Sequence, residues 1–181
     1  MTKYCLELAT FLLFVGVSGL RFPSLLRGPR GAPSWYATFF GAVGLLSVGV
    51  VIPLSTIDGW LGGTNVANLL QDECAVLAFW FFRNAVLDYT QDGQKRYPRW
   101  LLAIMLFATG FPFFLIQHRG ATSPYFGVDH ISQLADLAYE DLYFACLIFI
   151  CSGMIYSIRS NKSPLIRAIV VGLVLMGLGS L

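Results

Sequence analysis

The sequence predicts an all-α protein, a polytopic transmembrane helix bundle with about six spans. Hydrophobic residues make up 56% of its 181 residues and charged residues 12%, whereas soluble domains carry about 25% charged residues. Nine of the twelve Lys and Arg residues form short clusters between long apolar runs: Arg21, Arg27 and Arg30; Lys95, Arg96 and Arg99; Arg159, Lys162 and Arg167. The alternate connections, residues 55–65 and 117–133, contain only Arg119.

Positive charge in every second connection indicates how the chain is oriented. Basic residues are retained on the cytoplasmic side of an inner membrane. We therefore assign the basic clusters as topology anchors and expect cytoplasmic loops at residues 21–34, 90–99 and 159–163. With an even number of spans, both termini are then predicted to lie outside.

The expected spans follow from the need for about 20 mostly apolar residues per crossing. They are residues 5–20, 35–54, 66–88, 100–117, 138–158 and 164–181. Pro23 and Pro53 are expected to end the first two, and Trp35 and Trp100 to begin the second and fourth at the interface. The first segment also resembles a cleavable signal peptide, although the arginines that follow it favour retention.

Composition and motifs disfavour several functional classes. The basic residues border apolar runs, so we expect the lipid bilayer rather than nucleic acid as their partner. No nucleotide-binding, zinc-protease or hydrolase motif occurs, which disfavours an enzyme. The four cysteines are interpreted as small apolar residues, and His118 and His130 lack the spacing of a metal site. We expect no cofactor and no metal.

The third span contains polar residues that are costly at membrane depth. At 100° per residue, Asn65, Asn68, Asp72 and Arg83 fall within about 60° of one another, and Glu73 lies beside them. Arg83 is expected to extend towards the headgroups. About 16 Å of helix separates it from Asp72, which is therefore expected to find its partner on another span or in the 117–133 connection.

A second acidic group precedes the fifth span. We interpret residues 131–142 as an amphipathic helix on the outer surface, with Asp136 on its polar face. Glu140 borders the span, and Glu7 lies early in the first span. Asp72, Glu73, Glu140, Asp136 and Glu7 all fall in the outer half, which predicts an outward-facing acidic vestibule for a ligand or an ion. The alternative is an ordinary polar rim.

Residues 35–87 resemble a group of actinobacterial multi-pass membrane proteins of the seven-span type, usually labelled as transporters. The resemblance is carried by Pro53, Ile57-Asp58, Gly63 and the run Asn65-Val66-Ala67-Asn68-Leu69-Leu70. Thr64 replaces the proline of that group, and Gln71-Asp72-Glu73 replaces its histidine position. The resemblance implies a membrane bundle, here shortened to six spans, more than it implies a mechanism.

Three functions are compatible with this sequence. The first is a non-enzymatic sensor, regulatory or scaffold module with a cytoplasmic or neighbouring membrane partner protein. The second is a small-solute or ion transporter that uses the acidic vestibule. The third is a membrane-acting phage-exclusion or defence protein of a mobile element.

Overall fold

The computed structural model describes residues 2–26, 28, 32–49, 51–90, 96–120, 122–158 and 168. Every regular element within these residues is helical, which confirms the all-α class for this part of the chain. The helices are α1 (Thr2–Leu26), α2 (Ala32–Ser47), α3 (Leu54–Trp60), α4 (Val66–Thr90), α5 (Arg99–Leu115), α6 (Phe126–His130) and α7 (Leu134–Ile158). Apart from Ala168, the predicted sixth span, 164–181, lies outside the described residues.

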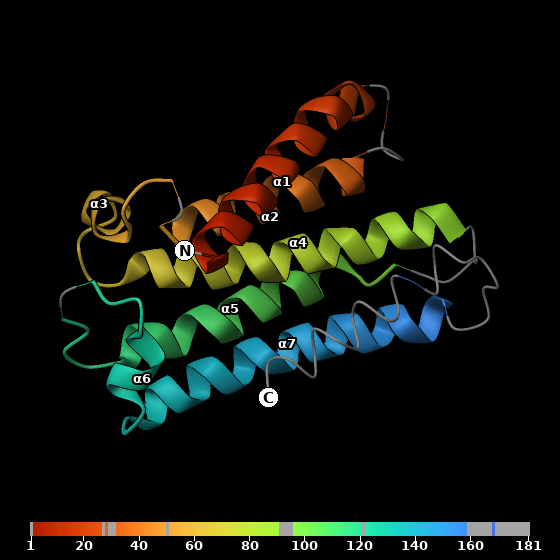
Figure 1. Ribbon diagram of the computed structural model, residues 1–181. Coiled ribbons are helices and arrows are strands. Elements are labelled where there is room, and N and C mark those ends of the chain that lie inside the picture. The colour runs from red at the N-terminus through yellow and green to blue at the C-terminus, as the bar shows by residue number, and fades with distance from the viewer. Residues whose placement is uncertain are drawn as a thin grey trace.

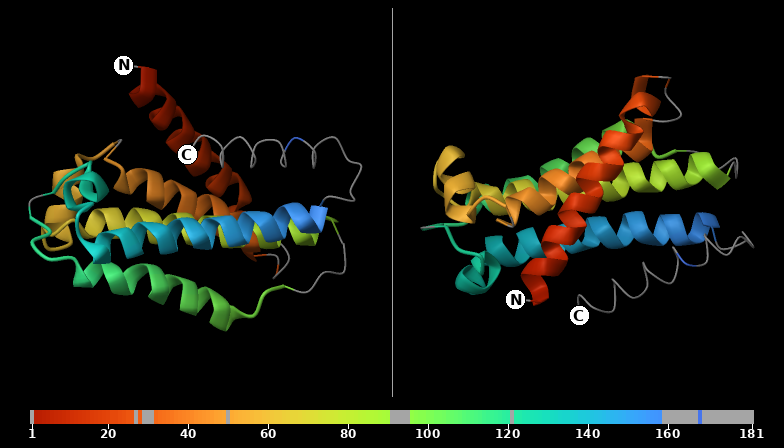
Figure 2. Two further views of the ribbon diagram at one scale, coloured as in Figure 1. Left: turned by 90° about the horizontal axis from the view of Figure 1, so that it is seen from below. Right: turned by 45° about the horizontal axis from the view of Figure 1, so that its top comes forward.

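Helix α4 is the centre of the bundle (Figure 1). On one side it packs against α2, which in turn carries α1, and on the other side it packs against α5 and α7. The five long helices run in alternating directions, so α3 and α6 lie together at one end (Figures 1 and 2). We call this the α3–α6 end. The opposite end, with the predicted basic loops, is called the basic end.

Helices α4 and α5 begin and end within two residues of the spans predicted at 66–88 and 100–117. Helix α1 differs, because it continues through Pro23 to Leu26. An internal proline removes one backbone donor, and the helix tolerates that loss near its end. Helix α2 ends at Ser47, before the predicted boundary. There the chain turns at Gly49, whose φ of 89° favours glycine, and Pro53 then caps the short helix α3, which the sequence did not predict.

Helix α7 is continuous from Leu134 to Ile158 (Figure 2). The interpretation of residues 131–142 as a separate surface helix is therefore wrong. Its physical reason is burial: Asp136 and Tyr139, one turn apart, are each only 1% exposed. The polar stripe at the start of α7 faces the bundle instead of water.

Within the part of the chain that the structure describes, two helices are long and apolar enough to cross a membrane: Cys5–Leu26 within α1, and Leu134–Ile158, which is α7. Helix α5 is apolar but shorter. Within the described residues, apolar clusters fill the interior along its whole length, from Phe113 and Tyr139 at the α3–α6 end to Val86 and Met154 at the basic end.

Candidate functional site

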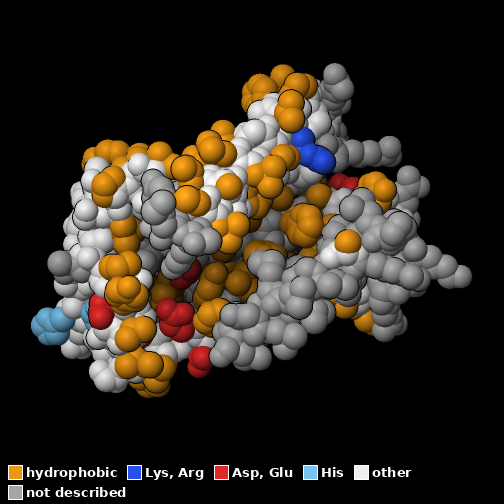
Figure 3. All heavy atoms as spheres, in the orientation of Figure 1, with side chains coloured by type: hydrophobic (Ala, Val, Ile, Leu, Met, Phe, Trp, Pro, Cys, Tyr) orange, Lys and Arg blue, Asp and Glu red, His pale blue; other side chains and the backbone are white. Residues whose placement is uncertain are grey.

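A cavity of about 830 Å³ opens at the α3–α6 end. Its walls come from α1, α4, α7, the α6 region and the connection between α2 and α3. The described lining residues are Glu7, Val48, Leu54, Asn68, Gln71, Asp72, Pro124, Tyr125, Phe126, Gly127, Tyr139, Glu140, Tyr143 and Phe144. We call it the acidic cavity. Acidic side chains gather at this end of the molecule, near α4 and α7 (Figure 3).

Three of the five predicted vestibule residues, Glu7, Asp72 and Glu140, line the acidic cavity. The described residues that line the cavity include no Lys, Arg or His. Asp72 accepts a hydrogen bond from the Tyr139 hydroxyl of α7. Its hydrogen-bond partner therefore comes from another helix, although a hydroxyl does not neutralise the carboxylate. Polar groups on α4 and α7 therefore hold this carboxylate between two helices.

The Glu140 carboxylate lies directly against the backbone of α6. A Cβ atom added to Gly127 would lie 2.5 Å from the Glu140 Oε1 atom. Glycine at this position leaves room for the carboxylate beneath α6. The segment that contains α6 thereby forms one wall of the cavity over an acidic side chain.

The other two predicted vestibule residues face elsewhere. Successive helical residues point about 100° apart, so Glu73 does not share the direction of Asp72. Instead it accepts a hydrogen bond of 2.6 Å from the Thr109 hydroxyl of α5. Asp136 is 1% exposed in the first turn of α7, and its Oδ1 atom has no hydrogen-bond partner among the described residues. Neither residue lines the acidic cavity.

Beside the cavity, Asp58 of α3 organises the start of α4. Its side chain is fully buried and accepts hydrogen bonds from the backbone N–H groups of Asn65 and Ala67, at 2.9 and 3.1 Å, and from the Thr122 hydroxyl at 2.6 Å. Burial acts to raise the pKa of Asp58, but the hydrogen bonds from Thr122, Ala67, Asn65 and Val66 outweigh it, and the pKa lies below its ordinary value.

Asn65 extends this network to the 116–125 connection. It adopts a φ of 61°, a left-handed conformation that Asn tolerates. Its side chain accepts a 2.8 Å hydrogen bond from the Ser123 N–H and donates to the Arg119 carbonyl. Asn68 donates to the Ser123 carbonyl at 3.2 Å. Asp58 and Asn65 thus fix the 116–125 connection, which supplies one cavity wall, to the start of α4.

Sequence reasoning missed Asp58 as a site residue, although it lies in the segment that carries the family resemblance. A helix cap is ordinarily sought within a few residues of the helix. Asp58 caps α4 from eight residues before Val66, which only the turn after α3 makes possible. The signal that could have indicated Asp58 is the Ile57-Asp58 pair, which stands directly before the glycines at 59, 62 and 63.

His130 ties α6 to the same connection. Its Nδ1 atom lies 3.0 Å from the Phe126 carbonyl and its Nε2 atom 3.1 Å from the His118 carbonyl. A carbonyl oxygen only accepts, so both contacts require N–H groups, as in imidazolium. The Phe126 carbonyl raises the pKa of His130 and burial lowers it. The His118 carbonyl, Asp136 and Asp129 raise it further, and the net pKa is above its ordinary value.

At the basic end, Arg83 is 3% exposed, so the prediction that it extends towards the headgroups is wrong. Its guanidinium carbon lies 3.6 Å from the centre of the Tyr97 ring, which replaces water with an aromatic face. Of the predicted topology anchors, Arg21, Arg96 and Arg99 are exposed, and Arg96 pairs with Asp88. Arg27, Arg30, Lys95, Arg159, Lys162 and Arg167 lie outside the described residues.

The chemistry of the acidic cavity is that of a binding site for positive charge. Among the described residues, no three His, Cys, Asp or Glu side chains converge to hold a metal ion. The carboxylates are instead spread over a cavity that also contains five aromatic side chains, Tyr125, Phe126, Tyr139, Tyr143 and Phe144. Aromatic faces, like carboxylates, attract organic cations.

The chain matches no protein-family model, and comparisons with curated proteins and with solved structures find no match. The resemblance to actinobacterial seven-span proteins stays a prediction. The function must therefore be inferred from the geometry of the chain itself.

Proposed function

We propose that the chain is a multi-pass inner-membrane protein that binds a small organic cation in the acidic cavity and carries it across the membrane. The cavity carries this proposal, because the carboxylates of Asp72 and Glu140 line it together with five aromatic rings. Its volume of about 830 Å³ lies within the range of about 300–1,000 Å³ for small-molecule sites. A bare metal ion needs far less space.

The membrane part of the proposal is supported by the outward face of the bundle. Large apolar side chains point away from the interior on α1, α5 and α7, such as Leu20 at 83% exposure, Phe107 at 68% and Ile148 at 66%. Exposed apolar surface of this extent marks contact with a membrane or a protein. The exposed apolar side chains follow three helices along their length, and a lipid bilayer is the environment that would contact such a surface. The hypotheses of a sensor or scaffold module and of a phage-exclusion protein remain predictions to which the cavity adds nothing.

We expect the α3–α6 end to face outside and the basic end to face the cytoplasm, with six spans and both termini outside. Single cysteines at Thr64 and at Pro98, in a background with the native cysteines replaced by alanine, would be labelled in intact cells with a membrane-impermeant maleimide. The cysteine at position 64 should react and the one at position 98 should react only after lysis. Labelling of position 98 in intact cells would reverse the orientation.

We expect Asp72→Asn and Glu140→Gln to weaken cation binding by about 10- to 100-fold each. A hydrogen bond or close contact to a charged group contributes about 1.5–3 kcal/mol, and both substitutions keep the side-chain shape. Equilibrium binding of radiolabelled tetraethylammonium to the purified protein in lipid nanodiscs measures the effect. If the solute is a cation, an anion of similar size should not compete.

Two neighbouring acids serve as matched controls. Asp141→Asn removes the same charge one residue along α7, at an exposed position. Glu73→Gln removes the charge that faces Thr109 of α5 instead of the cavity. Both variants should bind tetraethylammonium as the wild type does. Equal losses in all four variants would mean that only long-range charge matters, and the cavity would not be the site.

A further inference from the structure

A second cavity, of about 490 Å³, lies between α1, α2 and α4. Its described lining residues are Thr10, Phe14, Ala37, Thr38, Phe40, Gly41, Gly44, Leu45, Val48, Gln71, Ala75, Ala78, Phe79 and Phe82. All but three are apolar residues or glycine: the exceptions are Thr10, Thr38 and Gln71. We call it the apolar slot.

The sequence builds this slot from small residues on facing helices. Ala37, Gly41 and Gly44 share one face of α2, and Ala75 and Ala78 share one face of α4. The helices approach closely there, since a Cβ atom added to Gly44 would lie 3.4 Å from the Cys74 Cβ atom. Small side chains along a close helix pair leave a narrow space that larger ones would fill.

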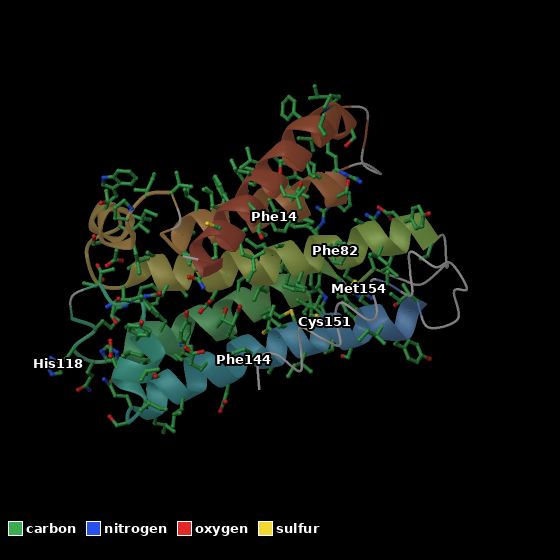
Figure 4. All side chains as sticks on the ribbon, in the orientation of Figure 1. Phe14, Phe82, His118, Phe144, Cys151 and Met154 are labelled. Atoms are coloured by element: carbon green, nitrogen blue, oxygen red, sulfur yellow. The ribbon has the colours of Figure 1, made fainter. Side chains whose placement is uncertain are left out.

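Aromatic side chains form the remaining walls. Phe14 of α1 and Phe82 of α4, both labelled in Figure 4, line the slot. Thr38 turns its hydroxyl onto its own helix, where it donates to the Ser34 and Trp35 carbonyls at 3.2 and 3.0 Å. This side chain therefore offers the slot its methyl group more than its polar atom. The slot is a surrounding for hydrocarbon.

The two cavities are neighbours, because Val48 and Gln71 line both of them. An acidic, aromatic cavity therefore borders an apolar one at these two residues. Phe144 of α7, labelled in Figure 4, belongs to the acidic end. We propose that the cation bound by this chain is amphiphilic, with its ammonium head in the acidic cavity and one alkyl tail in the apolar slot. This inference rests on the proposed function and names its substrate class.

Charge and hydrocarbon chemistry together select this occupant. The carboxylates of Asp72 and Glu140 reject an anionic amphiphile, since an uncompensated negative head would add to their repulsion. A purely polar cation has no hydrocarbon group to place in the apolar slot. Each methylene moved from water into an apolar site raises the affinity by a factor of about four. A tail that reaches the slot is thus expected to raise affinity strongly.

A chain-length series tests the proposal. Tetramethylammonium, butyltrimethylammonium and octyltrimethylammonium would compete with radiolabelled tetraethylammonium for the protein in lipid nanodiscs. Ala75→Leu fills the slot from α4 and Thr38→Leu fills it from α2, so the proposal does not depend on one variant folding. Ala103→Leu makes the same side-chain change as the first at an exposed position of α5 and is the matched control.

Affinities are compared after division by the affinity of each variant for tetramethylammonium. Partition of the alkyl chain into the bilayer is the same for every variant and cancels in this comparison. The measured quantity is the affinity for octyltrimethylammonium divided by the affinity for tetramethylammonium. We expect this ratio to be at least tenfold smaller in Ala75→Leu or Thr38→Leu than in wild type and Ala103→Leu. An equal gain in all four proteins would overturn the apolar slot as the tail site. Equal competition by octyl sulfate would overturn the cationic head.

The outcome is distinguishable from failure of the proposed function. If tetraethylammonium binding does not depend on Asp72 and Glu140, the acidic cavity is not a cation site and both proposals fail. If it depends on them but the chain-length gain is the same in the slot-filling variants, only the amphiphilic substrate class fails.

Discussion

Replacing Asp58 with alanine is expected to lower the free energy of unfolding by about 3–5 kcal/mol. The substitution leaves the N–H groups of Asn65 and Ala67 and the Thr122 hydroxyl without their acceptor at a fully buried position. Each unsatisfied buried donor costs about 1–3 kcal/mol, and loss of a helix cap costs about 0.5–2 kcal/mol. Equilibrium unfolding in mixed micelles, followed by circular dichroism, measures the difference.

The control is Asp141→Ala, which removes an exposed carboxylate from α7. It should change stability by no more than about 0.5 kcal/mol, as surface substitutions usually do. If Asp58→Ala is as stable as Asp141→Ala, the Asp58 network does not hold α3, α4 and the 116–125 connection together. The arrangement of the cavity wall would then need another explanation.

The Asp58 network should also respond to acid in a defined direction. The folded pKa of Asp58 is lower than the unfolded pKa, which is about 3.9 for a free aspartate. Folding is therefore favoured by the ionised group, and its full contribution is present above the unfolded pKa. It is lost as the pH falls through the lower folded pKa. The stability difference between wild type and Asp58→Asn should stay constant at neutral pH and shrink only below about pH 4.

The helical part of this fold was accessible from sequence because its signals are local. Apolar length and charge in alternate connections predicted helices close to α4 and α5. Pro23 and Pro53 were poorer guides, since proline sets the position of helix ends only when the surrounding contacts agree. Helix α3 is only seven residues long, which is too short to show a hydrophobic period. Its position also depends on the turn at Gly49, which hydrophobic periodicity does not predict.

The acidic residues show where such reasoning stops. Helical geometry correctly placed Asn68 and Asp72 on one face, and both line the cavity. It could not decide that Glu73 turns to Thr109 of α5, because that choice depends on which helices neighbour α4. The amphipathic pattern of its own segment predicts a surface position for Asp136. Burial of that stripe against the bundle, as seen for Tyr139, is a tertiary contact that the sequence pattern does not contain.

Gly153→Ala should destabilise the protein by about 1–3 kcal/mol, the opposite of its usual effect in a helix. In an ordinary helix alanine is about 1 kcal/mol better than glycine. In α7, however, a Cβ atom at Gly153 would clash with the Tyr97 hydroxyl and lie 3.5 Å from Arg83 Nε. The Tyr97 ring stacks on Phe149 at a centroid distance of 5.1 Å and covers the buried Arg83 guanidinium, so it has little freedom to move.

The control glycine is Gly16 of α1, where an added Cβ atom meets no atom within 4 Å. Gly16→Ala should therefore be neutral or stabilising by up to about 1 kcal/mol. Tyr97→Phe removes the hydroxyl that the new methyl group strikes and keeps an aromatic face over Arg83. In the Gly153→Ala/Tyr97→Phe double variant the loss should fall by at least about 1 kcal/mol relative to the sum of the single changes, measured by the same unfolding assay. Strictly additive effects would show that the new methyl group does not clash with the Tyr97 hydroxyl.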